Sequence, residues 1–182
     1  MSRDLAQGYR GPTESATQEA LPAVVAIGAN LGDRADTIGA ALGDLGRLPL
    51  TTLTASAEPI ESVALTLSGR DESAPGYLNT VALLSTRLAP TVLLEYLHAI
   101  EARHGRAPRT ADAPRWQDRT LDLDLIAYGD VRSDRAELTL PHPRAAERDF
   151  VLGPWLSVDP DAVLPGRGRV ADLLRELNGG AA

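Results

Sequence analysis

The chain has 182 residues, of which 43% are hydrophobic and 24% charged, and its formal net charge at pH 7 is −7. The length suits one domain with a single sizeable core, and the acidic balance argues against a general nucleic-acid binder. Cysteine is absent and all 18 basic residues are arginine, which excludes disulfides, a Walker A loop and a lysine general base. The sequence has no apolar run long enough to cross a membrane and no signal-peptide core, so we expect a cytoplasmic protein.

The first third of the chain predicts two strands around a helix, preceded by a polar tail. Residues 1–21 are small and polar, so we expect a disordered tail there and a single domain at 22–182. The apolar run 23–27 indicates a central strand, followed by a tight turn containing Gly28, Asn30 and Gly32 and a helix N-cap at Asp33. An apolar helical face at 38–45 and a threonine-rich strand at 51–60 complete this part.

The remaining elements complete an alternating order. We predict a loop or lid at 61–76, a strand at 77–88, a helix at 89–105, a second loop at 106–118 and a strand at 119–130. Segment 138–160 combines a short strand, a proline-rich turn and a short helical stretch, and a helix follows at 169–177. This order predicts an α+β fold with a ferredoxin-like βαββαβ core, a mostly antiparallel sheet covered by helices on one face, and C-terminal additions.

Two aspartates interrupt the strand "LDLDLI". Residues two apart on a strand share a face at roughly 6.5–7 Å, so Asp122 and Asp124 point together while Leu121, Leu123 and Leu125 point into the core. Neighbouring carboxylates repel each other, and Mg²⁺ offers compensation because it accepts carboxylate oxygens together with waters and substrate phosphates. Taken alone, the pair also fits a solvated strand face that happens to carry acids.

Arginines gather before and after this pair, at positions 106, 109, 115, 119, 144 and 148. Carboxylates for a metal beside arginines for phosphate oxygens suit nucleotide polyphosphate chemistry. Surface ion pairs with Asp112, Asp118 and Glu147 are the alternative for these arginines.

Five segments resemble one enzyme family in their order and spacing: "IGANLGDR", "YLN", "HAIEARHGR", "RWQDRTLDLDLIAYGD" and "LPHPRAAERDFVL". The family is 6-hydroxymethyl-7,8-dihydropterin pyrophosphokinase of folate biosynthesis, and the resemblance covers residues 23 to 165. It implies transfer of diphosphate from ATP to the hydroxymethyl group of the dihydropterin, with release of AMP. It also implies two Mg²⁺ ions held by Asp122 and Asp124, and in-line attack on the β-phosphorus.

The resemblance further implies which residues bind each substrate. The catalytic set is Arg109, Arg119, His142 and Arg148. The ATP-binding set is Glu101, Arg106, Arg109, Trp116, Arg119, Thr139, His142 and Arg148. The pterin-binding set is Ser62, Tyr77, Asn79, Asp122 and Phe150.

Several of these residues also fit plainer roles. Glu101 fits an exposed helix surface, Trp116 a loop anchor and Phe150 core packing. Ser62 stands where the family commonly has a threonine in a Tyr-x-Thr-x-Pro pattern, whose other places are taken here by Ile60 and Ala64.

Two other classes of function are compatible with the residues. One is a D-x-D metal-dependent nucleotide-sugar transferase, and the other is a non-catalytic ferredoxin-like module that binds RNA or a small effector. On the pyrophosphokinase hypothesis the partners are ATP and the dihydropterin, without nucleic acid or membrane, and the chain is a monomer or small homo-oligomer.

Overall fold

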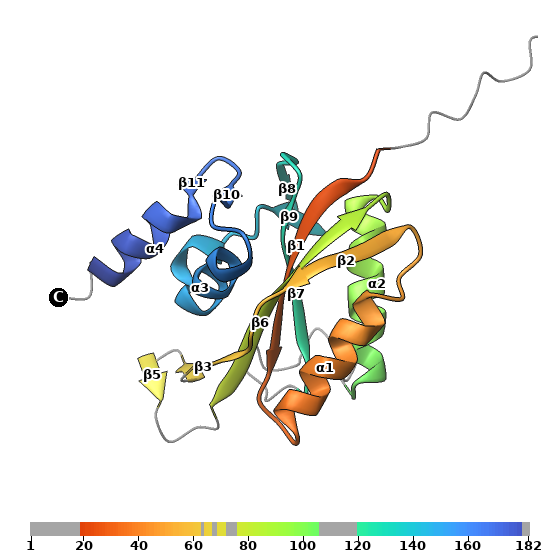
Figure 1. Ribbon diagram of the computed structural model, residues 1–182, viewed down its shortest axis with the longest axis horizontal. Coiled ribbons are helices and arrows are strands. Elements are labelled where there is room, and N and C mark those ends of the chain that lie inside the picture. Colours follow the sequence, from red (N-terminus) through yellow and green to blue (C-terminus); the bar gives the residue numbers. More distant parts are fainter. Residues whose placement is uncertain (1–18, 63, 67–68, 72–75, 106–119, 180–182) are drawn as a thin grey trace, which may run out of the picture.

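The computed structural model describes residues 19–62, 64–66, 69–71, 76–105 and 120–179. Within this part of the chain, five strands form the main sheet, in the order β2-β6-β1-β7 with β3 also paired to β6 (Figure 1). The strands are β1 (Leu21–Ala29), β2 (Thr51–Ser56), β3 (Ile60–Ser62), β6 (Tyr77–Thr86) and β7 (Asp122–Tyr128). All of these pairings are antiparallel.

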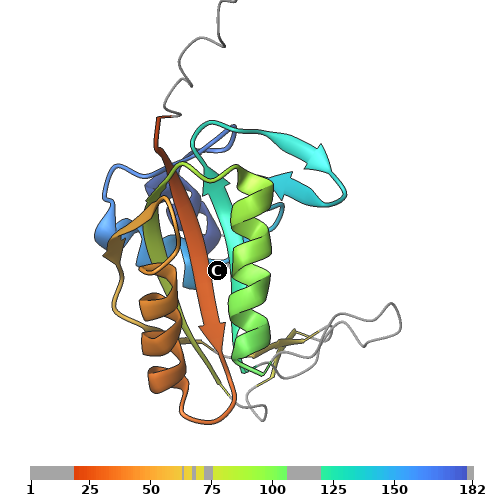
Figure 2. The same ribbon diagram turned by 90° about the vertical axis from the view of Figure 1, so that its right-hand side faces the viewer.

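Two helices cover one face of this sheet, α1 (Arg34–Leu45) between β1 and β2 and α2 (Pro90–Arg103) between β6 and β7. Figure 2 shows both helices on the viewer's side of the sheet, with β1 visible between them. The chain therefore follows β1-α1-β2-β6-α2-β7, which confirms the predicted α+β, ferredoxin-like core.

The core under α1 and α2 fixes which way β1 and β7 face. Ala23, Val25 and Ile27 of β1 alternate into this core, where they meet Leu123 and Leu125 of β7. Because successive strand residues point to opposite faces, the intervening residues of both strands are directed to the other side of the sheet.

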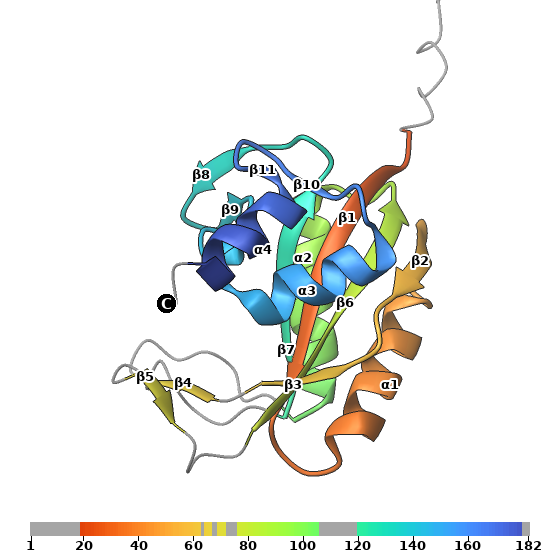
Figure 3. The same cartoon turned by 60° about the vertical axis from the view of Figure 1, so that its left-hand side comes forward.

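That other side is also covered by helices, so the expectation that helices lie on one face only is wrong. α3 (Asp149–Val158) lies across it, as Figure 3 shows, and α4 (Val170–Gly179) packs against α3. Val24, Val81 and Ile126 project from the sheet into a second core that includes Trp155 of α3. This face is apolar along the middle of the strands, and the C-terminal helices remove that surface from water.

The connections contain short strands that sequence periodicity did not predict. The expected loop at 61–76 holds the end of β3 and a hairpin of β4 (Ala64–Thr66) and β5 (Gly69–Asp71). Three-residue strands are too short to show a period of two. β9 (Leu138–Leu140) is the short strand expected in segment 138–160. The other short elements are β8 (Ser133–Arg135), the 3₁₀ turn η1 (Ala145–Glu147), β10 (Val163–Leu164) and β11 (Gly168–Arg169).

The first strand begins slightly earlier than expected. β1 begins at Leu21, the last residue of the tail expected at 1–21, whereas residues 1–18 and the loop expected at 106–118 lie outside the described residues. Among the described helices, none has the length and apolar character needed to span a bilayer.

Asp44 joins the C-terminal ends of α1 and α2. Its carboxylate accepts from Arg47 at 2.7 Å and lies 3.1 Å from Nε2 of His104 and 3.4 Å from Arg103. Burial raises the pKa of Asp44, but hydrogen bonds from Arg47 and His104 and the charge of Arg103 outweigh it and hold the pKa below its ordinary value of 3.8.

Replacing Asp44 with asparagine should lower the free energy of unfolding at pH 7 by on the order of 1 kcal/mol, because both arginines are largely exposed. A depressed pKa stabilises the fold above the unfolded-state pKa, and this contribution is lost as the pH falls through the folded-state value. Urea unfolding of both proteins should therefore show a difference that shrinks as the pH falls below 3.8. A difference independent of pH would contradict this role.

Candidate active site

The two aspartates of β7 lie on the α3 side of the sheet. Across the β1–β7 ladder Asp122 is opposite Gly28 and Asp124 is opposite Ala26, while Leu123 between them belongs to the core under α1 and α2. The shared face predicted for the pair therefore agrees with the pairing. Because Leu123 is buried on the opposite side, neither aspartate can turn away without disrupting the core.

Gly28 leaves space on the sheet surface between Asn79 and Asp122, because it has no side chain. It lies within β1 rather than in the predicted turn, opposite Asp122 on one side and Asn79 of β6 on the other. A Cβ atom added at Gly28 would come within 3.0 Å of Oδ1 of Asn79 and 4.0 Å of the Tyr77 ring. A side chain here would push against the Asn79 amide, which explains why glycine suits this place in the strand.

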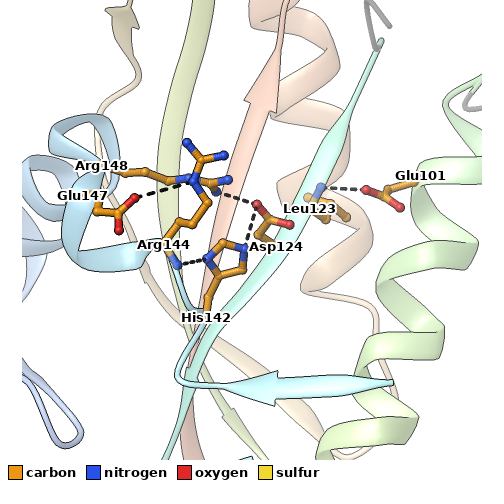
Figure 4. A network of polar contacts seen from close by, with 7 residues as sticks. All are labelled: Glu101, Leu123, Asp124, His142, Arg144, Glu147 and Arg148. Carbon is orange, nitrogen blue, oxygen red and sulfur yellow. Dashed lines mark hydrogen bonds and ion pairs between the residues drawn. The ribbon is translucent and has the colours of Figure 1, made fainter. Parts of the chain in front are cut away.

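Asp124 is held by basic side chains from the segment after β9. Arg148 donates from Nη1 to Oδ2 of Asp124 at 2.7 Å, and Nε2 of His142 lies 3.8 Å from the same oxygen (Figure 4). The backbone N–H of His142 donates to the carbonyl of Ile126 at 2.8 Å, which anchors this segment to β7. Two of the predicted catalytic residues thus meet a predicted metal ligand.

His142 is set up as a neutral donor. Burial lowers its pKa from the ordinary 6.5, Arg148 and Arg144 lower it further, and the charges of Asp124 and Asp122 oppose this without reversing the direction. Its Nδ1 accepts from the backbone N–H of Arg144 at 3.3 Å, so the proton of the neutral ring is on Nε2, which faces Asp124.

Glu101 is buried, and the alternative of an exposed helix surface is wrong. Its side chain on α2 is 1% exposed and accepts a hydrogen bond from the backbone N–H of Leu123 at 2.8 Å (Figure 4). Among the strands that the structure describes, β7 is the last in the sheet order, so none of them is left to pair with this N–H. Glu101 therefore ties α2 to the peptide between the two aspartates, while its predicted contact with ATP stays a prediction.

The predicted pterin-binding residues converge from β3, β6 and α3. Nδ2 of the buried Asn79 donates to Oγ of Ser62 at 2.6 Å, and Ser62 is paired with Tyr77 across the β3–β6 ladder. Phe150 is in the first turn of α3, where its ring packs against the second core and lies 5.8 Å from the Arg148 guanidinium. Phe150 thus contributes to core packing, and stacking on a pterin remains a prediction.

Other predicted residues lie elsewhere or outside the described chain. Thr139 is exposed on β9 and donates to the carbonyl of Arg135 at 3.2 Å, and Arg144 forms a surface ion pair with Glu147 at 3.6 Å. Among the residues that the structure describes, no group of three or more His, Asp or Glu side chains is placed to hold a metal. The residues outside the described ranges are Arg106, Arg109, Arg115, Trp116 and Arg119.

Arg34, the last residue of the segment "IGANLGDR", was not among the predicted site residues, and it lies in the first turn of α1. Its guanidinium donates to the carbonyl of Gly76 at 2.7 Å and to Oε1 of Glu61 at 3.0 Å. These partners are 42 and 27 residues away in the chain, and a local pattern carries no signal for such contacts.

The solved structures similar to this chain include one titled "Crystal Structure Analysis of the HPPK-DHPS in complex with substrates". The TM-score is 0.65 at 11% sequence identity, over 89% of this chain and 44% of the other. The chain thus spans less than half the length of that protein, and the likeness shows the fold. It confirms the predicted α+β class.

Sequence relatives define the class of protein, a pyrophosphokinase. A 2-amino-4-hydroxy-6-hydroxymethyldihydropteridine pyrophosphokinase from Haemophilus influenzae is 33% identical, with 86% of this chain and 93% of the relative covered. The protein of the same name from Pseudomonas aeruginosa is 39% identical, over 82% of this chain and 88% of the relative.

The model of the 7,8-dihydro-6-hydroxymethylpterin-pyrophosphokinase (HPPK) family matches residues 24–160, and the chain belongs to this family. The resemblance and the enzyme class predicted from the sequence, an ATP-dependent pyrophosphokinase, are thereby confirmed. Family membership leaves the nucleotide-sugar transferase and the non-catalytic module without support.

Proposed function

We propose that the chain transfers diphosphate from ATP to the hydroxymethyl group of 6-hydroxymethyl-7,8-dihydropterin, with release of AMP, as a step of folate biosynthesis. The observation that carries this proposal is that Asp122, Asp124 and Asn79 share one face of the sheet, with Arg148 and His142 beside Asp124. The pterin substrate is supported by the names of the relatives from H. influenzae and P. aeruginosa.

Asp122 and Asp124 are the proposed ligands of two Mg²⁺ ions. Two carboxylates from the protein fit this cation, because it takes its other positions from waters and substrate phosphates. The side chain of Asp124 is 29% exposed, which leaves room for those ligands. When bound, magnesium would neutralise phosphate oxygens and align the pterin hydroxyl with the β-phosphorus.

Arg148 and His142 would serve the phosphate end of the site. The Arg148 guanidinium has more donors than its bond to Asp124 uses, and these suit phosphate oxygens. Nε2 of neutral His142 is a second donor at the same place. The remaining contacts to ATP are proposed from the family resemblance, for Glu101, Arg106, Arg109, Trp116, Arg119 and Thr139.

Asn79 and its neighbours would serve the pterin end. With Nδ2 of Asn79 engaged by Ser62, its Oδ1 lies over Gly28, where it can accept from an N–H group on the pterin edge. Phe150 and Tyr77 are proposed to stack on opposite faces of the ring. Asp122, across Gly28 from Asn79, is close to where the hydroxymethyl group would lie.

The proposed reaction needs positioning more than an activated nucleophile. The hydroxymethyl oxygen forms a bond to the β-phosphorus, the bond from that phosphorus to the α,β-bridging oxygen breaks, and AMP leaves with the bridging oxygen. The hydroxyl proton goes to solvent. A loose transition state of this kind depends on alignment and charge neutralisation, which the aspartates and arginine can provide.

The test is AMP formation from ATP, followed by chromatography with and without the dihydropterin and with and without Mg²⁺. We expect AMP when both are present, in equal amount to the pterin diphosphate formed. AMP formed equally without the pterin, or no AMP at all, would contradict the proposal. The cytoplasmic location and the absence of nucleic-acid or membrane partners remain predictions within it.

A further inference from the structure

We propose that Arg34 is a positioning residue that holds the pterin-binding face of β3 and β6 from behind. The proposal rests on the proposed function, since it assigns Ser62, Tyr77 and Asn79 to the pterin. Arg34 itself lies outside the residue set that the family resemblance implies, and it acts through those side chains rather than on the substrate.

The guanidinium of Arg34 bridges two residues that directly precede pterin-binding residues in the sequence, Glu61 before Ser62 and Gly76 before Tyr77. Nη1 donates to the carbonyl of Gly76, directly before β6, and Nη2 donates to Glu61 on β3. A planar guanidinium can hold both partners at once, whereas an ammonium would act as a point charge. The first turn of α1 is thereby fixed to both strands.

The pairing of β3 with β6 places neighbouring residues of β3 on opposite faces of the sheet, a back that faces α1 and a front that carries the predicted pterin-binding residues. Glu61 is opposite Leu78, which packs against the core on the α1 side, so Glu61 points back toward Arg34. Its neighbour Ser62 points to the front, where its Oγ accepts from Asn79. A contact that fixes Glu61 therefore fixes the position of Ser62, and through it the orientation of the Asn79 amide.

Gly76 extends this link to Tyr77. A Cβ atom at Gly76 would be 3.6 Å from Nη1 of Arg34 and 3.5 Å from the carbonyl oxygen of Ser62, so the Arg34 side chain and the Ser62 backbone both lie close to Gly76. Tyr77 follows Gly76 directly and is paired with Ser62. Displacing Gly76 would thus tilt the ring predicted to stack on the pterin.

We expect the Arg34 contacts to fix the positions of the pterin-binding residues and to contribute little to the stability of the fold. The side chains of Arg34 and Glu61 are 30% and 73% exposed, and exposed ion pairs contribute about 0–1 kcal/mol. A cleft of about 370 Å³ adjoins them, lined by Gly32, Asp33, Arg34, Ala35, Glu61 and Leu78. Water can replace a truncated arginine in this cleft, so an Arg34 variant should keep its fold.

The experiment measures the Kd of the dihydropterin in the presence of a non-hydrolysable ATP analogue, and separately the Kd of the analogue alone. Arg34→Ala should weaken pterin binding about tenfold, equivalent to ~1.4 kcal/mol, and change analogue binding less than twofold. Arg34→Lys should recover part of the loss, because one of the two contacts can be kept. Arg175→Ala, which removes an exposed arginine of α4, is the matched control and should change neither constant.

Unchanged pterin affinity in Arg34→Ala would overturn the proposal, and so would an equal loss of affinity for both ligands with a large fall in Tm. A ligand-free readout separates it from the proposed function: the side-chain amide signals of Asn79 in ¹⁵N-correlated NMR spectra should shift in Arg34→Ala. If the wild type binds no pterin while these signals shift, the proposed function fails and the positioning role stands. If they do not shift, the positioning role fails.

Discussion

Replacing Asp122 or Asp124 with asparagine is expected to lower kcat by roughly three orders of magnitude or more while the protein remains folded. Asparagine has the size of aspartate but lacks its charge, so magnesium would lose one of two proposed protein ligands. Both positions are partly exposed on the α3 face, and the leucines that anchor β7 in the core are unchanged.

The measurements are turnover at saturating Mg²⁺ and calorimetric titration of Mg²⁺ with an ATP analogue. Asp130→Asn, an exposed carboxylate in the turn after β7, is the matched control and should behave as the wild type. Asp124→Asn also weakens the ion pair with Arg148. The urea unfolding of this variant is therefore measured as well, so that a loss of stability can be distinguished from a loss of turnover. Near-normal turnover in either variant of the pair would remove the metal assignment.

Replacing Glu101 with leucine is expected to lower both the stability of the protein and its affinity for Mg²⁺. The N–H of Leu123 would be left buried without its acceptor, which costs about 1–3 kcal/mol. That N–H lies in the strand between the two proposed metal ligands, so its release also loosens their spacing. Unfolding in urea and the calorimetric Mg²⁺ titration report the two effects independently.

Glu101→Gln separates the hydrogen bond from the charge. Glutamine keeps an oxygen that can accept from Leu123, so this variant should retain more stability and more magnesium affinity than Glu101→Leu. A Glu101→Leu protein as stable as the wild type would show that the bond to β7 is unimportant. Equal damage in both variants would show that the carboxylate charge, rather than the contact with Leu123, is what the site needs.

Much of the fold could be predicted from local patterns. The apolar stripe at helical spacing correctly predicted α2, and the alternation in "LDLDL" correctly predicted β7. The order of the predicted elements indicated the βαββαβ core. The second helical layer was not predicted, because the apolar residues that receive it, Val24, Val81 and Ile126, are far apart in the chain. Short hairpins such as β4 and β5 lack the length for a periodic signal.

The candidate site likewise has one part that local sequence patterns predict and another that depends on tertiary packing. Asp122 and Asp124 are two residues apart, so strand geometry alone directed them to one face. The family resemblance named Arg148 and His142, but their contact with Asp124 arises where the segment after β9 returns to β7. No spacing rule could show this, since the return depends on tertiary packing.

The sequence by itself determined the family, the order of the elements and the paired carboxylates, because each is encoded within a short segment or by a strand or helix period. Tertiary structure alone decided that Glu101 is buried behind β7 rather than exposed, and that Arg34 ties α1 to Glu61 and Gly76. All three contacts join residues more than 20 positions apart, and such pairs form only when the sheet brings separate elements together.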